Sequence, residues 1–356
     1  MKILTINPGS TSTKVAVYED LTPVLTVSLR HSVEDLAPFE TVNDQFEFRK
    51  NLVLEALRQH DIPLEFDAVV GRGGLLKPIE GGVYHINDKM LSEMEHPMRL
   101  HACNLGCRIA NDIAAMIPGC TALTADPGVV DELVDKARIS GSPLMPRITT
   151  WHALNQRAIG RRFAKELNDG RRYEDLNLII AHLGGGISVG AHRKGRCIDV
   201  NNAFDGEGPF SPERAGTLPA GSLIDLCYSG KYTSQALKRR ISGNAGLAAH
   251  LGTTDVAQVV KNIEAGDEKS RLVLDAMIYN VAKYIGSMAV ALEGKVDGIL
   301  LTGGIAHSEY VTSRIWKQIS FLAPRIKVYP GEDEMLALAM NGLGALKGEI
   351  PVKEYV

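Results

Sequence analysis

Two distant stretches of the chain carry the same order of apolar and polar residues. Each begins with an apolar, β-branched run, continues into a tight turn rich in Gly, Ser and Thr, and ends in a second apolar run. These stretches are residues 2–18 and 178–192. The order predicts two strands joined by a turn in each stretch. Residues 24–29 and 197–200 predict a third strand after each pair.

The rest of the chain alternates between helical and strand patterns. Helices are predicted where apolar residues recur every three to four positions. These segments are residues 46–60, 100–116, 150–167, 270–292 and 335–346. Short β-branched runs predict strands at 66–70, 120–125, 297–302 and 325–329. The order of three strands followed by helices and further strands occurs twice, which predicts an α/β protein with an internal repeat of about 170 residues.

The turns in the two strand pairs are too rich in Gly, Ser and Thr to be simple connections. Glycine lets the backbone approach a ligand closely and direct several N–H groups at one point, which suits a phosphate group. Two such turns predict two related lobes that hold a polyphosphate between them. Residues 205–221, rich in Pro and Gly, predict the longest loop, and loops of this length are often functional.

The length of 356 residues exceeds what one hydrophobic core usually serves, so two domains are expected. We place the first domain at residues 1–150 together with about 333–356. The second domain is then residues 151–332, and it contains the second glycine turn.

Composition narrows the class of protein. Hydrophobic residues make up 45% of the chain and charged residues 23%, as in ordinary globular proteins. The formal charge of −3 and the absence of a long basic run give no basis for a nucleic-acid partner. We find no export signal and no apolar run of membrane-spanning length, so we expect a cytoplasmic protein without a membrane partner.

The five cysteines are an odd number without disulfide spacing, which indicates reduced thiols. Cys103 and Cys107, together with His101, form the one conceivable metal set in this part of the sequence. They have no fourth ligand and no paired cysteine motif. We therefore expect buried thiols on one helical face and no metal at this place.

Six motifs, in order along essentially the whole chain, resemble the acetate kinase family. They are NPGSTSTK (7–14), RGG (72–74), TWH (150–152), HLGGG (182–186), FSP (210–212) and TGGIAHS (302–308). The resemblance implies two ribonuclease-H-like domains of the actin-like ATPase type with an interdomain cleft. It implies reversible transfer of a phosphoryl group from ATP to a short-chain carboxylate, which gives an acyl phosphate and ADP. It also implies Mg²⁺ as a cofactor and a homodimer or larger homo-oligomer.

The chemistry of this reaction favours cations over a general base. A carboxyl group titrates at about 4, so the acceptor is already ionised near neutral pH. The transferring phosphoryl group must instead be stabilised by Arg, His, backbone N–H groups and Mg²⁺. Arg72, between glycines at a predicted strand end, can hold a carboxylate with both arms of its guanidinium. The resemblance implies Arg214 as a second active-site arginine, although the spacing after the FSP motif differs from that in acetate kinases.

The resemblance assigns further catalytic and substrate-binding residues. His152 corresponds to the histidine that contacts the transferring phosphoryl group, and His182 to the histidine of the phosphate loop. His101 resembles another active-site histidine on the substrate side. Asp126 resembles the aspartate that orients Mg²⁺ or the phosphoryl group. The alternatives are a buried structural histidine and an ordinary turn aspartate.

The remaining assignments concern the nucleotide and its metal ion. For the metal ion the resemblance implies Asn7 and a glutamate near the C-terminus, either Glu334 or Glu332; both glutamates could instead begin the final helix as favourable charges. The residues implied to bind the nucleotide are Asn7, Ser10, Ser12, Lys14, His182, Gly184, Gly185, Gly186, Gly303, Gly304 and Ser308.

Two departures from acetate kinases bear on the substrate. Gly185 stands where acetate kinases have an asparagine, and the last turn ends in Ala306, His307 and Ser308 instead of a more acidic sequence. Both departures point to the branch of the family that acts on butyrate. The alternatives are a kinase for acetate, propionate or a branched-chain acid, and a non-catalytic nucleotide switch with the same fold.

Overall fold

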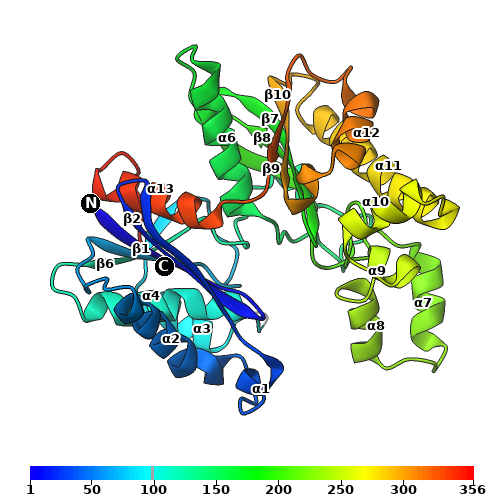
Figure 1. Ribbon diagram of the computed structural model, residues 1–356. Coiled ribbons are helices and arrows are strands. Elements are labelled where there is room, and N and C mark those ends of the chain that lie inside the picture. Colours follow the sequence, from blue (N-terminus) through cyan, green and yellow to red (C-terminus); the bar gives the residue numbers. More distant parts are fainter. Residues whose placement is uncertain (98–99) are drawn as a thin grey trace. The chain divides into compact units, whose positions relative to one another are not determined.

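The computed structural model describes residues 1–97 and 100–356 (Figure 1). This part of the chain divides into two compact units, each built around its own sheet. Unit 1 consists of Met1–Val130 and Asp333–Val356, and unit 2 of Asp131–Glu332. The predicted α/β class is confirmed, because both units combine a mixed sheet with helices on its faces.

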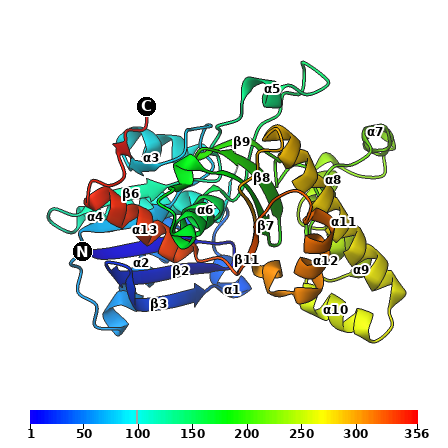
Figure 2. The ribbon, with the colours of Figure 1, turned by 90° about the horizontal axis from the view of Figure 1, so that it is seen from above.

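The sheet of unit 1 has seven strands in the order β12-β5-β6-β4-β1-β2-β3. Its strands are β1 (Lys2–Pro8), β2 (Ser12–Glu19), β3 (Thr22–Arg30), β4 (Ala68–Arg72), β5 (Val83–His85), β6 (Thr121–Ala125) and β12 (Val352–Lys353). The predicted three-strand unit is present: β1 pairs antiparallel with β2, and β2 with β3 (Figure 2). On its other side β1 pairs with β4 in parallel, and β4 with β6.

Helices cover both faces of this sheet because its central strands are apolar on both sides. The α-helices in the described part of unit 1 are α1 (Val33–Leu36), α2 (Phe46–Gln59), α3 (Asp88–Glu95), α4 (Leu105–Ala115) and α13 (Glu334–Leu346). Leu4 and Ile6 of β1 point into a core shared with α2 and α4. On the opposite face α13 packs so closely that a Cβ atom on Gly342 would lie 2.7 Å from Val70 (Figure 1).

The sheet of unit 2 repeats the strand order of unit 1 without the two short strands. Its order is β11-β10-β7-β8-β9, which matches β6-β4-β1-β2-β3. The strands are β7 (Asn177–Leu183), β8 (Ile187–Arg193), β9 (Arg196–Val200), β10 (Gly298–Gly303) and β11 (Ile326–Pro330). The hairpin pairs are antiparallel, and β10 is parallel to both of its neighbours. The internal repeat predicted from the sequence is therefore a repeat of topology.

Alternate side chains of β7 face two different cores in unit 2. Leu178 and Ile180 pack with Phe163 of α6 (Ala153–Leu167), whereas Ile179 and Ala181 belong to the larger core on the other face. Helices α9 to α12 lie on the side of this larger core (Figure 1). Besides α6, the α-helices described in unit 2 are α5 (Asp135–Arg138), α7 (Ala220–Tyr228), α8 (Ser234–Ile241), α9 (Gly246–Leu251), α10 (Val256–Glu264), α11 (Glu268–Ala291) and α12 (Glu309–Ile319).

Two predicted helices begin later than expected. The helix predicted at 100–116 starts with a 3₁₀ turn at Ala102–Asn104 (η2), and α4 follows at Leu105. The helix predicted at 150–167 begins at Ala153, since His152 has φ −85° and ψ 60° and so lies outside the helical conformation. In both cases the offset leaves a candidate histidine, His101 or His152, in a non-helical conformation directly before a helix.

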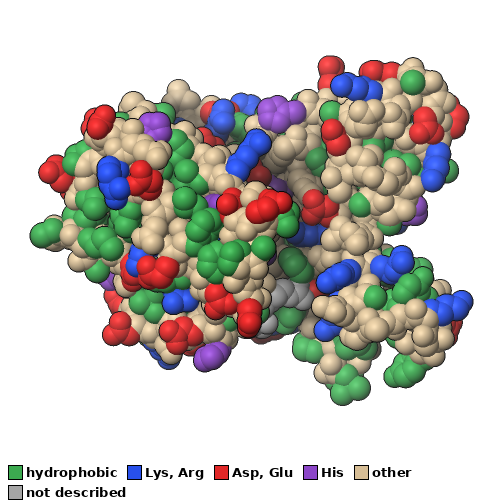
Figure 3. All heavy atoms as spheres, turned by 60° about the horizontal axis from the view of Figure 1, so that its bottom comes forward, with side chains coloured by type: hydrophobic (Ala, Val, Ile, Leu, Met, Phe, Trp, Pro, Cys, Tyr) green, Lys and Arg blue, Asp and Glu red, His purple; other side chains and the backbone are tan. Residues whose placement is uncertain are grey.

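The surface carries mixed charge. On the face shown in Figure 3, Lys and Arg side chains are interspersed with Asp and Glu side chains rather than gathered into one basic area. Of the helices in the described part of the chain, none combines the length and the hydrophobicity that crossing a bilayer requires.

Candidate active site

The first glycine-containing turn, between β1 and β2, is held from below by a buried arginine. Arg49 of α2 is 1% exposed, and its guanidinium donates to the carbonyl oxygens of Gly9 (2.9 Å), Ser12 (3.2 Å) and Ser10 (3.3 Å). Burial lowers the pKa of this guanidinium. The carbonyl oxygens of the turn therefore bind a buried positive charge. This charge favours the binding of an anion such as phosphate near the turn.

Arg72 lies at the end of β4 in a cluster with two candidate metal ligands. Its Nη1 donates to Oε2 of Glu334 at 2.6 Å and to Oδ1 of Asn7 at 3.3 Å. Nδ2 of Asn7 donates to the same Glu334 oxygen at 2.6 Å. Glu334 is buried at the start of α13, whereas 32% of the Arg72 side chain is exposed. The structure thus joins three predicted residues from three separate parts of the sequence.

Glycines around Arg72 let the strand end pack against its neighbours. A Cβ on Gly106 would lie 2.3 Å from the carbonyl oxygen of Arg72, and a Cβ on Gly73 would lie 2.5 Å from Pro127. A Cβ on Gly74 would similarly meet Asn104 at 2.7 Å. These contacts bring the Arg72 loop against the segments that carry His101 and Asp126.

His101 and Asp126 both have structural contacts of their own. The Nδ1 atom of His101 accepts the backbone N–H of Cys103 at 3.2 Å and so begins the 3₁₀ turn η2. Asp126 follows β6 with φ 41°, and its Oδ1 accepts the backbone N–H of Gly82 at 2.8 Å. Asp126 is only 1% exposed. Asp126 therefore stabilises a turn, as the structural alternative predicts, and it also lies in the segment that packs against the Arg72 loop.

All five cysteines are free. Burial raises the pKa of Cys103 to about 11 and that of Cys107 to about 12, so both thiols are protonated at neutral pH. Within residues 1–97 and 100–356, no three His, Cys, Asp or Glu side chains are arranged to hold a metal ion.

Two candidate histidines of unit 2 lie face to face. The rings of His152 and His182 stack with centroids 3.8 Å apart and an angle of 10° between their planes. Nδ1 of His152 is 2.8 Å from Oγ of Ser188, and Nδ1 of His182 is 2.8 Å from Oδ1 of Asn155. Nε2 of His182 lies 3.5 Å from the carboxylate of Glu332.

The second glycine turn, between β7 and β8, lies directly against Arg214. A Cβ on Gly186 would lie 2.1 Å from Nη1 of Arg214, so a side chain at this position would displace the guanidinium. The guanidinium donates to the carbonyl oxygen of Ala203 and lies 4.9 Å from the ring of Phe204. Ser211 fixes the turn by donating its hydroxyl to the carbonyl oxygen of Gly185 at 2.6 Å.

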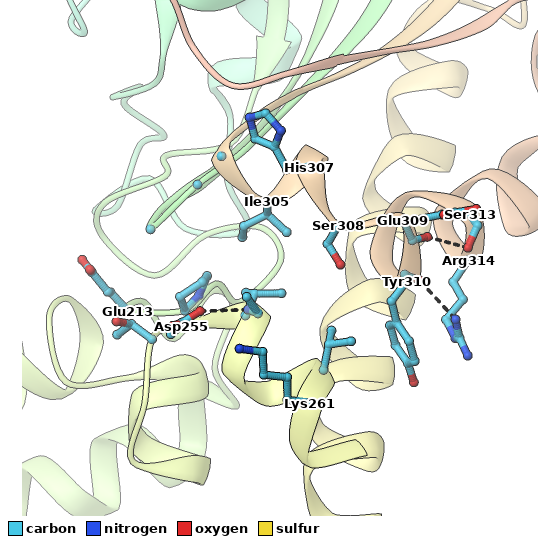
Figure 4. A pocket seen from close by; sticks show the side chains of 18 of the residues that line it. Glu213, Asp255, Lys261, Ile305, His307, Ser308, Glu309, Tyr310, Ser313 and Arg314 are labelled. Carbon is cyan, nitrogen blue, oxygen red and sulfur yellow. Dashed lines mark hydrogen bonds between the residues drawn. The ribbon is translucent and has the colours of Figure 1, made fainter. Parts of the chain in front are cut away.

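A pocket of about 1050 Å³ in unit 2 joins this turn to the turn after β10. Gly184 and Gly185 line it together with Gly304, Ser308 and Glu332. Gly303, directly before these, has φ 92°, and a Cβ there would lie 2.4 Å from the carbonyl oxygen of Leu183. In Figure 4, side chains of α10 and α12 reach the same space from other sides. They include Lys261, Tyr310 and Arg314, together with Asp255, the N-cap residue of α10.

The predicted residues therefore divide between the two units. Unit 1 holds Asn7, Ser10, Ser12, Lys14, Arg72, His101, Asp126 and Glu334. Unit 2 holds His152, His182, Gly184, Gly185, Gly186, Arg214, Gly303, Gly304, Ser308 and Glu332. Ser10 and Lys14 of the first turn are exposed, and Ser12 is partly buried.

Comparison with known proteins gives the family. Residues 147–329 match the sequence model of the acetokinase family. The chain belongs to this family. It is 66% identical to "Probable butyrate kinase" of Bacteroides thetaiotaomicron over the full length of both chains, and 52% identical to "Butyrate kinase 2" of Clostridium acetobutylicum over 99% of both. The resemblance stated from the motifs is thus confirmed.

The fold is that of a solved acetokinase-family structure. The acetate kinase of Porphyromonas gingivalis superposes with a TM-score of 0.77 over 97% of this chain and 99% of its own, at 19% identity. At this identity the likeness concerns the fold alone.

Several residues of these clusters were not predicted from the sequence. Arg49 lies near the start of α2, with no motif around it. Ser188 and Gln156 touch the His152 region, but both are ordinary polar residues in apolar segments. Lys261 and Arg314 line the pocket from helices that carry no recognised motif. Only three-dimensional proximity identifies these residues.

Proposed function

We infer that this protein is a butyrate kinase, which transfers a phosphoryl group from ATP to butyrate, reversibly, to give butyryl phosphate and ADP. The observation that carries this inference is the 66% identity to a "Probable butyrate kinase" over the whole of both chains. A second relative from another organism, "Butyrate kinase 2", is 52% identical to this chain and supports the same inference.

The side chains suit a carboxylate acceptor. Butyrate is ionised at neutral pH, so its oxygen attacks without a general base. Arg72 would hold the carboxylate, with His101 and Arg214 as further substrate-binding candidates. The pairing of Arg72 with Glu334 supports this role, because the ion pair holds the guanidinium in place at the end of β4.

The pocket of unit 2 suits the nucleotide. Its volume of about 1050 Å³ is at the upper end of ligand pockets, and the two glycine turns at its edge allow a phosphate chain to approach the backbone. We assign the phosphates to the turn of His182, Gly184, Gly185 and Gly186, and the adenosine to the turn of Gly303, Gly304 and Ser308. His152 and Asp126 would act on the transferring phosphoryl group, together with Arg72, His182 and Arg214.

The candidate metal ligands fit Mg²⁺ chemically. Asn7 and Glu334 offer amide and carboxylate oxygens, which are the donors that Mg²⁺ uses. The two residues are joined by the Nδ2 group of Asn7, and both oxygens accept from Nη1 of Arg72, which the ion would have to replace. These two residues would hold the ion, and Glu332, which lines the nucleotide pocket, is the alternative. When bound, the ion supplies positive charge to the phosphates of ATP. Comparing Glu334→Gln with Glu332→Gln for the Mg²⁺ concentration that gives half-maximal rate decides between them.

We also propose a homodimer or larger homo-oligomer in the cytoplasm, where ATP is available. Leu272, Tyr279 and Val290 of α11 support the oligomer: they are 72%, 56% and 78% exposed and lie on one face of the helix. The domains predicted from the sequence, 1–150 with 333–356 and 151–332, remain our proposal for its organisation.

The reaction itself can be tested by trapping its product. Incubation of the purified protein with MgATP, butyrate and hydroxylamine should yield butyryl hydroxamate in an amount equal to the ADP formed. If hydroxamate forms from another short-chain carboxylate but not from butyrate, that carboxylate is the substrate and the proposal of butyrate is wrong. Failure of every short-chain carboxylate would contradict the kinase and favour a nucleotide switch.

A further inference from the structure

A chain of buried hydrogen bonds runs from His152 into the interior of unit 2. Nδ1 of His152 is 2.8 Å from Oγ of Ser188, which is 2.8 Å from Nε2 of Gln156. Oε1 of Gln156 is 2.8 Å from Nε2 of His192, whose Nδ1 is 2.6 Å from the hydroxyl of Tyr173. Ser188, Gln156 and His192 are 0% exposed. Of these five residues, only His152 has a role in the proposed reaction.

One contact with the backbone determines which groups donate and which accept in this chain of hydrogen bonds. Nε2 of Gln156 also lies 3.1 Å from the carbonyl oxygen of Ser188. A carbonyl oxygen can only accept, so the amide of Gln156 must present its NH₂ group to Ser188 and its oxygen to His192. The reversed amide would place two acceptors against each other in a buried site, which is costly.

The orientation of Gln156 determines the proton on His192. Because Oε1 of Gln156 accepts, Nε2 of His192 must carry a proton. Burial lowers the pKa of His192 to about 3, so the ring is neutral and its Nδ1 is an acceptor for the Tyr173 hydroxyl. Gly190 leaves room for this arrangement: a Cβ there would lie 2.7 Å from Oε1 of Gln156 and 3.0 Å from Nε2 of His192.

The same orientation determines the proton on Ser188. Its Oγ accepts from Nε2 of Gln156 and, at 3.4 Å, from the backbone N–H of His152. These two donors use both acceptor positions of the hydroxyl. The Ser188 hydrogen is therefore left to donate to Nδ1 of His152.

We propose that this hydrogen-bond chain holds His152 as the neutral tautomer protonated on Nε2, ready to donate a hydrogen bond to the transferring phosphoryl group. Ser188, Gln156 and His192 are positioning residues that act through His152. The role in phosphoryl transfer rests on the proposed butyrate kinase activity, whereas the tautomer follows from the hydrogen bonds alone. The stacked ring of His182 agrees with a neutral His152, because two charged imidazoles 3.8 Å apart would repel each other.

The tautomer can be measured without any assay of activity. Long-range ¹H–¹⁵N NMR spectra of the full chain labelled with ¹⁵N-histidine distinguish the two neutral tautomers, and the His152→Asn variant identifies the His152 signals. We expect a protonated Nε2 and an unprotonated Nδ1 in the wild-type protein at neutral pH. A proton on Nδ1 of His152 would overturn the proposal.

The positioning role needs a kinetic test with matched serines. Ser188→Ala should lower kcat about tenfold, the equivalent of one positioned hydrogen bond, and leave KM for ATP and butyrate within about twofold. Its NMR spectrum should show a mixture of His152 tautomers. Ser188→Thr keeps the hydroxyl and should restore both the tautomer and most of kcat.

The control is Ser270→Ala, which removes a 1% exposed hydroxyl that donates to Asp267 far from His152 in the sequence and outside the candidate site. It should leave kcat unchanged. An unaltered tautomer or an unaltered kcat in Ser188→Ala would overturn the positioning role. If the wild-type protein phosphorylates no carboxylate, the proposed function fails, and the NMR result still decides whether the hydrogen-bond chain sets the tautomer.

Discussion

At the scale of single residues, the sequence proposes candidate side chains but does not show which residues they contact. Arg72 was identified by its flanking glycines, and Asn7 by its place before the first turn. Their shared contact with Glu334 could not be predicted, because Glu334 is more than 250 positions from both and only the fold brings it to β4. His152 was likewise identified, whereas Ser188 and Gln156 carry no local signal.

Arg72 provides the most direct prediction at this scale. Replacing Arg72 with alanine should lower kcat/KM for butyrate by about 10²–10³, because it removes a cation from the developing negative charge. Steady-state kinetics with a folded variant, checked by circular dichroism, measures this. Arg58→Ala, which changes an exposed arginine on α2, is the control and should retain wild-type activity. An Arg72→Ala enzyme as fast as the control would remove Arg72 from the active site.

His192 provides a prediction about pH. The unfolded chain takes up the histidine proton near pH 6.5, but burial lowers the folded pKa to about 3. The unfolded state therefore binds more protons between these values, and stability is lost as the pH falls from about 6.5 towards 3, by up to about 1.4 kcal/mol per pH unit.

Urea unfolding at several pH values between 6.5 and 5 measures this effect. His192→Gln removes the titrating group, so its free energy of unfolding should fall less steeply with decreasing pH than that of the wild type. Equal slopes for the two proteins would show that His192 is not the buried neutral group described above.

At the scale of elements, periodicity predicted the strands that form the centre of both sheets and the long helices that cover them. Two short strands of unit 1, β5 and the edge strand β12, were missed, because three and two residues carry too little pattern to recognise. Helices α7, α9, α10 and α12 were also missed, and two of them, α10 and α12, line the pocket of unit 2. The pocket walls were therefore less predictable than the turns at its edge.

The packing of α4 on β4 can be tested through its glycine. Gly106→Ala would place a Cβ 2.3 Å from the carbonyl oxygen of Arg72, so we expect a loss of about 1–3 kcal/mol in the free energy of unfolding. Gly221→Ala is the matched helical control, since a Cβ there meets nothing within 4 Å. Chemical denaturation should show Gly221→Ala at or slightly above wild-type stability. Two variants of equal stability would contradict the close approach.

At the scale of the whole molecule, the order of the motifs predicted the family, and the two similar strand patterns predicted the repeated sheet topology. The acyl chain length of the substrate was harder to predict, because no motif encodes the size of an apolar pocket. A pocket discriminates by only about 1–3 kcal/mol per methylene, which a few apolar side chains determine. The proposal of butyrate as the acceptor therefore rests on the full-length identity to relatives of that name, together with the two motif departures.

The exposed face of α11 yields a prediction about assembly. Leu272 and Val290 are 72% and 78% exposed, and burial of this face between subunits would explain it. The double substitution of Leu272 and Val290 by glutamate should lower the mass measured by light scattering towards that of the monomer, 38.6 kDa. The wild-type protein should be at least a dimer. Equal masses for both proteins would place the interface elsewhere.

The central claim is that this protein phosphorylates butyrate, and the most direct measurement is a comparison of kcat/KM for acetate, propionate, butyrate and isobutyrate with MgATP. Two methylenes separate acetate from butyrate, so we expect butyrate to exceed acetate by at least about a hundredfold, with propionate between them. A preference for acetate, or turnover of none of the four acids, would contradict the account.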